Sequence, residues 1–127
     1  MFCHRATIQE CNKILKKLNG IKYLITGNHD NYVNSEEFDV SAFAWIKSYY
    51  SFKEKGNQYV LFHYPILEWE GFYQNAILLY GHVHNHNTSY FDETLGSYAV
   101  NVGADLTNFT PISIYEINSL VNNRLNK

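Results

Sequence analysis

The chain has 127 residues, of which 46% are hydrophobic, and a formal net charge of −2. This length and composition are typical of one globular domain with its own core, so we expect a single domain over residues 1–127. The small net charge argues against nucleic acid as a partner, and no apolar run approaches the roughly 20 residues of a membrane span.

The start of the chain shows neither a secretory signal nor a disulfide scaffold. Residues 1–8 contain no apolar run of the kind that a signal peptide needs. Cys3 and Cys11 are the only cysteines, and we expect them to be reduced thiols with a structural or surface role. His4 is expected at the surface. These features predict a cytoplasmic protein.

The first predicted element is an amphipathic helix that starts near Thr7. Its apolar positions recur at helical spacing and are Ile8, Cys11, Ile14, Leu15 and Leu18. Asn19-Gly20 ends this helix, and residues 21–26 follow as a strand. A helix followed directly by a strand is half of an α/β repeat, yet no strand precedes this helix in the sequence.

The rest of the chain is predicted to consist mainly of strands and loops. We expect a loop with one helical turn at 31–39, a hairpin of 44–54 with 58–62, and a loop at 67–75. Residues 76–80 are predicted to form a buried strand, and 88–92 and 97–102 two further strands. Ser113 and Glu116 have the spacing of a capping box that opens a helix through Arg124.

Histidines follow three of these strand-like runs. His29 comes shortly after residues 21–26, His63 follows residues 59–62, and His82 and His84 follow residues 76–80. In open α/β sheets, ligands bind in the crevice outside the carboxyl ends of the strands. We therefore expect these histidines to gather at one site.

The spacing of His82 and His84 suits metal binding. On an extended backbone, residues two positions apart point to the same side, so both imidazoles are predicted to aim at one point. Together with His63 and the carboxamide oxygen of Asn28, they would offer ligands that borderline divalent metals accept. The alternative is a polar loop in which the histidines bind no metal.

Gly27-Asn28-His29-Asp30, His63-Tyr64-Pro65-Ile66 and Gly81-His82-Val83-His84 occur in this order along the chain. Together they resemble the later motifs of the calcineurin-like metallophosphoesterases, at the spacing of the small bacterial and phage-type members. Residues 101–105 and 111–113 also resemble the tail of those members. The resemblance covers roughly the whole chain. It implies an α/β fold in which two packed β-sheets form a sandwich flanked by helices.

The resemblance also implies a metal-dependent hydrolysis of phosphomonoesters or phosphodiesters. In that family the residues matching Asn28, His63 and His82 hold one metal, and the residue matching His84 holds the other. The implied cofactor is a divalent transition metal such as Mn, Zn, Fe or Ni. Such a metal polarises a phosphoryl oxygen and lowers the pKa of a bound water towards about 7, which supplies a hydroxide nucleophile.

The same resemblance assigns catalytic roles to the two residues that follow Asn28. The residue matching His29 acts as an acid for the leaving group or as a clamp on the phosphate. The residue matching Asp30 orients it, and a carboxylate beside an imidazole favours the protonated form of that imidazole. For Asp105 the sequence suggests no chemical role, and His86 and Asn85 are expected to be loop or outer groups.

The family's Asp-x-His and Gly-Asp motifs, which end its first two strands, are absent from this sequence. We therefore expect a domain truncated at its N-terminus, with one metal and impaired activity, because the missing Asp bridges both metals in the family. The sheet edge left open is expected to pair with a second copy, giving a homo-oligomer, or with a separate fragment. A third possibility is a shortened gene product that is not a working enzyme.

Two functions of other kinds remain open. The histidine cluster would also suit a non-catalytic module derived from this fold, which binds one structural metal or a partner. A metal-dependent nuclease is disfavoured because the chain has no basic stretch. The motifs identify chemistry at phosphorus but not the alcohol of the phosphoester substrate.

Overall fold

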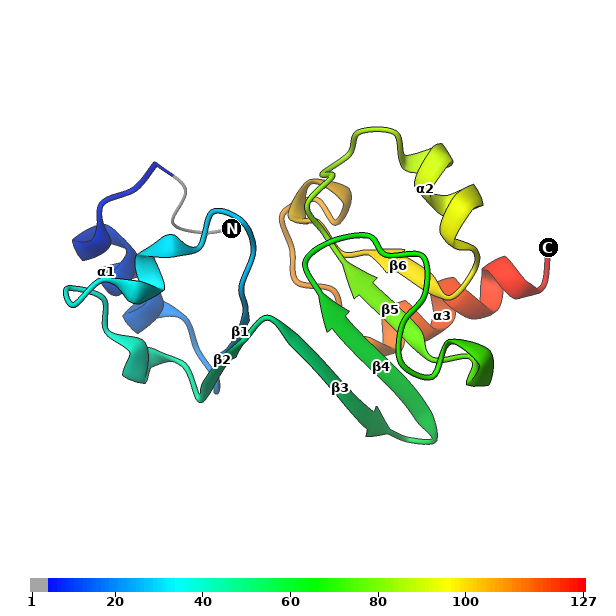
Figure 1. Cartoon of the computed structure of the whole chain (residues 1–127), viewed down its shortest axis with the longest axis horizontal. Coiled ribbons are helices and arrows are strands. Elements are labelled where there is room, and N and C mark those ends of the chain that lie inside the picture. Colours follow the sequence, from blue (N-terminus) through cyan, green and yellow to red (C-terminus); the bar gives the residue numbers. More distant parts are fainter. Residues whose placement is uncertain (1–4) are drawn as a thin grey trace. The chain divides into compact units, whose positions relative to one another are not determined.

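The computed structural model describes residues 5–127, so His4 and Cys3 lie outside the described residues. The chain comprises two compact units, the first ending at Ser48 and the second running over Tyr49–Lys127, and each is described by itself. Over residues 5–127, three α-helices and two sheets, of two and four strands, make up a small α/β protein (Figure 1). That the two units make up one domain stays a prediction.

The first unit opens with the predicted helix, α1 (Ile8–Lys17). Thr7 caps it, because its hydroxyl accepts a hydrogen bond from the Glu10 N–H at 3.2 Å while the Glu10 carboxylate accepts one from the Thr7 N–H at 2.9 Å. Cys11 and Leu15 are buried against Phe38. Cys11 is disulfide-bonded, so the expectation of a reduced thiol is wrong at this position.

The sheet of the first unit has two parallel strands, β1 (Tyr23–Ile25) and β2 (Trp45–Lys47). This pairing corrects part of the predicted hairpin of 44–54 with 58–62, because residues 45–47 belong to the first sheet. The chain instead divides at Ser48, and only the part after it reaches the second sheet. The helical turn expected in the loop that follows β1 is present as a 3-10 helix at Asn31–Asn34.

The second unit is built on a four-stranded sheet of order β3-β4-β5-β6. Its strands are β3 (Tyr49–Glu54), β4 (Asn57–Phe62), β5 (Ile77–Tyr80) and β6 (Ala99–Asn101). β3 and β4 form an antiparallel hairpin, whereas β4, β5 and β6 run parallel. The carboxyl ends of these three parallel strands therefore meet at one edge of the sheet.

Helices cover both faces of this sheet. On one face, Leu95 of α2 (Thr88–Leu95) packs in a cluster with Val60, Leu78 and Trp69. On the other face, α3 (Ile114–Leu125) adds Ile117 and Val121 to a second cluster (Figure 1). Every residue of β5 is buried as a result. A strand buried on both faces reads as a continuous apolar run, which is why residues 76–80 could be predicted.

The predictions for the segments before and after β6 had different outcomes. The strand predicted over 88–92 is wrong, because these residues begin α2. Phe91 and Leu95 lie four positions apart, so a helix brings both to the same core, and Gly96 caps its end. The capping box before α3 is confirmed, since Ser113 and Glu116 exchange hydrogen bonds of 2.7 and 3.2 Å.

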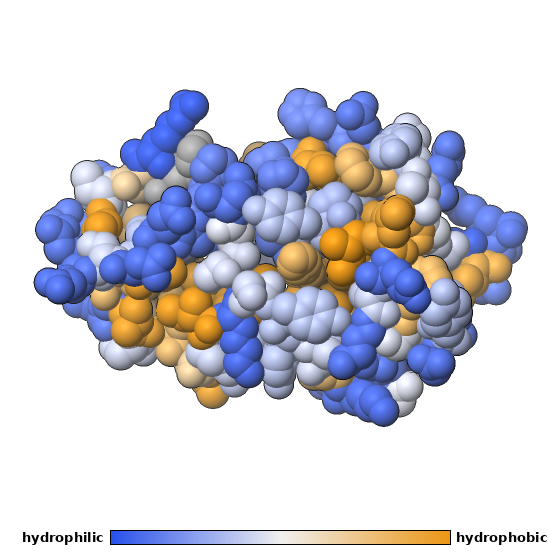
Figure 2. All heavy atoms as spheres, viewed as in Figure 1, coloured by the Kyte–Doolittle hydropathy of each residue, from blue (hydrophilic) through white to orange (hydrophobic). Residues whose placement is uncertain are grey.

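Both units leave apolar side chains on their surfaces (orange in Figure 2). In the first unit, Ile21 is 78% exposed and Tyr23 of β1 is 54% exposed. Within the described chain, β2 is the one strand that pairs with β1, so the other edge of β1 is open. Self-association through this edge stays a prediction. Among residues 5–127, no helix has the length and apolarity that crossing a membrane requires.

Gly71 is expected to tolerate no side chain. Its φ of +75° is left-handed, and a Cβ there would lie 2.8 Å from the Ala76 Cβ and overlap the Gln58 carboxamide. We expect Gly71→Ala to lower the free energy of unfolding by about 2 to 4 kcal/mol, from backbone strain and overpacking together. Gly56 has a similar φ of +82° but open space around it. Gly56→Ala therefore measures the loss of unfolding free energy that comes from backbone strain alone. Urea unfolding would measure both, and equal losses would contradict the packing argument.

Candidate metal centre

Two of the predicted histidines lie at the carboxyl ends of neighbouring parallel strands. His63 follows β4 directly, and Gly81-His82 follows β5. The Gly81 N–H donates to the His63 carbonyl oxygen at 2.9 Å, so the pairing of the two strands continues as far as the histidines. The expectation that strand ends collect these side chains is thus met for His63 and His82 within the second unit.

The imidazole rings of His63 and His82 are in direct contact. His63 Nε2 lies 3.2 Å from His82 Nδ1, and the ring centroids are 5.1 Å apart. Two nitrogens 3.2 Å apart, each about 2.1 Å from a shared metal ion, would subtend an angle of about 100° at that ion. This value lies between the angles of octahedral and tetrahedral coordination. The pair therefore fits two neighbouring ligands of one transition metal.

His82 sits in a strained turn. Its φ is +69°, and the Val83 N–H donates to the Gly81 carbonyl oxygen at 2.8 Å across it. A hydrogen bond that spans a single residue of positive φ marks the rare, strained form of the γ-turn. Such strain costs about 1 to 3 kcal/mol and persists mainly at functional sites. Glycine would adopt this conformation freely, so the presence of an imidazole here indicates a need for its side chain.

Tyr64 packs against both histidines. Its ring centroid lies 4.7 Å from that of His82 and 4.9 Å from that of His63. The aromatic contact limits the rotation of both imidazoles. Sequence reasoning did not give Tyr64 a role, although its place directly after His63 is the signal that could have suggested one.

His84 does not share the direction predicted for it. The expectation that His82 and His84 point to one side required an extended backbone, and it is wrong because both residues have positive φ, +69° and +52°. The strand ends at Tyr80, and the chain then turns. The His84 ring instead meets Asp105, with 3.2 Å between Nδ1 and Oδ2.

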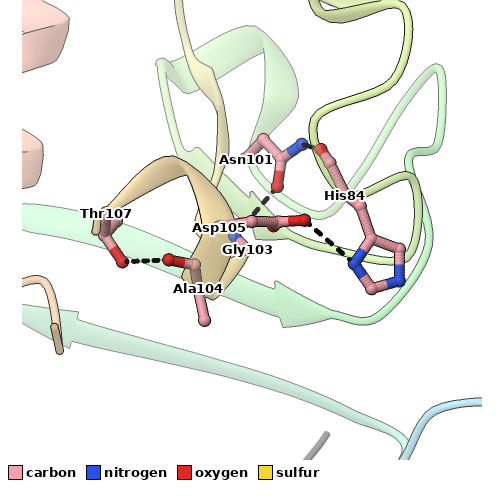
Figure 3. Close-up of polar contacts among 6 residues, drawn as sticks. All are labelled: His84, Asn101, Gly103, Ala104, Asp105 and Thr107. Carbon is pink, nitrogen blue, oxygen red and sulfur yellow. Dashed lines mark hydrogen bonds and ion pairs between the residues drawn. The ribbon is translucent and has the colours of Figure 1, made fainter. Parts of the chain in front are cut away.

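A polar network fixes this second histidine (Figure 3). The Asn101 side-chain N–H donates to the His84 carbonyl oxygen at 2.8 Å, and its Oδ1 accepts from the Gly103 N–H at 2.9 Å. A Cβ on Gly103 would lie 3.1 Å from both Asn101 Oδ1 and Asp105 Oδ1, so a side chain there would crowd the network. Asn101 and Asp105 thus both contact His84, and the sequence did not reveal either contact.

The first unit carries the other three predicted site residues in the turn after β1. Asp30 is 7% exposed and closes this turn, since its Oδ2 accepts from the Gly27 N–H at 2.6 Å. Asn28 and His29, which lie between Gly27 and Asp30 in this turn, are exposed. Burial raises the pKa of the nearby Tyr32 hydroxyl, and the Asp30 carboxylate adds to this shift, so the phenol stays neutral.

The structure therefore brings the candidate residues together in pairs. Within the second unit, His63 meets His82, and His84 meets Asp105. Among the residues that the structure describes, no group of three or more His, Cys, Asp or Glu side chains is placed to hold a metal ion. The donor set fits part of a metal site. Roles for Asn28 as a ligand and for His29 and Asp30 in catalysis stay predictions.

The fold is similar to a solved structure, that of the protein of unknown function AQ665 from Aquifex aeolicus. The two chains are 29% identical with a TM-score of 0.66, and the match covers 92% of this chain and 70% of that chain. Comparison with models of protein families finds no match, and comparison with curated proteins finds none either. The similarity supports the α/β architecture and carries no activity with it.

Proposed function

We propose that this chain is a metal-dependent phosphoesterase of the calcineurin-like type. The observation that carries the proposal is the 3.2 Å separation of His63 Nε2 and His82 Nδ1 at the ends of two parallel strands. Two imidazoles at that distance match two ligands of one ion. They belong to motifs that follow one another in the order of that family. The two-sheet sandwich of that family is part of the proposal.

The histidine pair would hold the ion, and its surroundings would keep the pair in place. When bound, a divalent metal supplies Lewis-acid polarisation of the phosphoryl group and activation of water. Tyr64 restricts both rings, and the γ-turn at His82 presents that ring from the end of a buried strand. Such preorganisation lowers the cost of binding, because fewer rotamers are lost. His84 would offer its Nε2 to a metal as well.

The experiment combines metal analysis with hydrolysis of an activated phosphodiester, bis-p-nitrophenyl phosphate. After extraction with a chelator, the protein is titrated with Mn²⁺ or Zn²⁺, and turnover is followed in the same samples. We expect about one tightly bound ion per chain, and slow hydrolysis that disappears with chelator and returns with metal. Slow turnover is expected because one ion lacks the clamp that two metals place on attacking and leaving oxygens.

The second candidate is a non-catalytic module that binds one metal. It is favoured by the absence, within the described residues, of a group of three or more His, Cys, Asp or Glu side chains placed to hold a metal ion. The same titration separates the two functions. Metal binding without metal-dependent hydrolysis would support the module, whereas hydrolysis that chelator leaves unchanged would contradict a metal-dependent phosphoesterase. A chain that binds no divalent metal would contradict both.

A further inference from the structure

We propose that Asp105 is a positioning residue that holds His84 with Nε2 unprotonated and turned outward as a metal ligand. This inference rests on the proposed function in one respect, that a metal is bound. It starts from the contact between Asp105 Oδ2 and His84 Nδ1, 3.2 Å apart. The sequence motifs suggest no role for Asp105.

The contact determines which ring nitrogen of His84 carries the proton. An ionised carboxylate only accepts hydrogen bonds, so Nδ1 must be the donor. The neutral imidazole then has its lone pair on Nε2, and Figure 3 shows this nitrogen pointing away from Asp105. Metal-bound histidines commonly donate their other N–H to a carboxylate, which sets both the tautomer and the ring orientation.

The surroundings of the pair give the two partners different exposure. The His84 side chain is 69% exposed, so its outward nitrogen is accessible, whereas the Asp105 side chain is 24% exposed. Asn101 adds a brace from β6 by donating to the His84 carbonyl oxygen. The φ of +52° places the His84 backbone in the left-handed region. Asn101 thus holds the backbone of His84, and Asp105 holds its ring.

A purely stabilising role explains this arrangement poorly. Asp105 Oδ1 is buried and has no hydrogen-bond partner among the described residues. Leaving a buried acceptor unsatisfied costs free energy, and a hydrogen bond with an exposed imidazole returns little. A carboxylate kept at such a cost indicates a use for its other oxygen, and that oxygen faces His84.

The test reads the His84 tautomer directly in metal-free protein. Two-dimensional NMR correlating the ring nitrogens and protons is recorded under mildly alkaline conditions, which favour neutral imidazoles. In the native protein we expect the Nδ1–H form of His84. In Asp105→Ala we expect a shift towards the Nε2–H form that unconstrained imidazoles favour. An unchanged tautomer in Asp105→Ala would overturn the proposal.

Metal affinity supplies the second readout. Mn²⁺ titration calorimetry on the native protein and on His84→Ala first shows which Mn²⁺ binding depends on His84. Asp105→Ala is then expected to weaken the affinity of that binding by about 10- to 100-fold. Wild-type affinity in Asp105→Ala would contradict the positioning role. If Asp105 sets the tautomer but no metal binds to the native protein, the positioning of His84 stands and the proposed function fails.

Asp92→Ala is the matched control. Asp92 also lies in an ion pair, with 3.3 Å to Arg124 Nη2, and it contacts no histidine in the described chain. Its replacement removes a comparable carboxylate and should leave both the His84 tautomer and the metal affinity as in the native protein. A similar loss in Asp92→Ala would assign the effect of Asp105→Ala to general destabilisation, and so would overturn the proposal.

Discussion

Alanine in place of His82 is expected to abolish metal binding and any metal-dependent hydrolysis. His82 supplies one of two nitrogens that lie 3.2 Å apart, and a single remaining imidazole from this pair would hold an ion weakly. The loss of affinity should exceed about 100-fold, the upper range for losing a group that only supports a ligand. Titration calorimetry with Mn²⁺ and the phosphodiester assay would measure the two effects.

His86→Ala is the control for this substitution. His86 lies in the same loop and is exposed, and nothing places it with the His63–His82 pair. Its removal should leave metal affinity unchanged. Equal loss in His82→Ala and His86→Ala would indicate adventitious binding by surface histidines and would contradict the assigned site.

His82→Gly adds a result that a merely structural histidine would not produce. Glycine adopts the positive φ of this γ-turn at little cost, so the metal-free protein should be more stable by about 1 kcal/mol. Metal binding should be lost as in His82→Ala. Higher stability combined with lost binding would show that strain at His82 is retained for the sake of its side chain.

Leu78→Ala is expected to cause a large loss of stability in the second unit. Leu78 is fully buried at the centre of β5 and packs with Val60, Trp69 and Ala99. Removing such a side chain leaves a cavity in addition to the lost transfer free energy, and together these cost about 2 to 5 kcal/mol. Urea unfolding followed by circular dichroism would measure the change.

Leu67→Ala provides the comparison for Leu78→Ala. Leu67 is 73% exposed in the loop between β4 and β5, so its removal should change the free energy of unfolding by less than about 0.5 kcal/mol. If Leu78→Ala cost no more than Leu67→Ala, β5 would not be the central buried strand. The position of His82 at its end would then lose its structural basis.

Local patterns in the sequence were sufficient for several elements. The helical spacing of apolar residues after Thr7 and the capping box at Ser113 predicted two helices, because both signals lie within a few turns of the chain. The apolar run at 76–80 predicted the buried strand β5. The hairpin turn at Lys55-Gly56 joins β3 and β4 as expected. Each of these features depends on neighbours along the chain.

Other predictions failed because distant contacts decided the outcome. Residues 45–47 looked like the start of a hairpin strand, but they pair with β1, more than twenty residues earlier in the sequence. Residues 88–92 contain Thr and aromatic side chains that suit a strand, yet they form a helix because Phe91 and Leu95 reach the same core. Propensity is a weak guide where packing offers more free energy than the local preference.

Histidines at the ends of apolar runs are visible in the sequence, and their positions predicted His63 and His82 as neighbours. The partner of His84, in contrast, could be identified only from the folded chain. The rule that alternate residues share a side holds for extended backbone, and the chain leaves that conformation after Tyr80. Asp105, which lies 21 residues beyond His84, meets it because β5 and β6 pair in parallel and both loops leave at one edge. Such a contact depends on strand pairing, which no local spacing encodes.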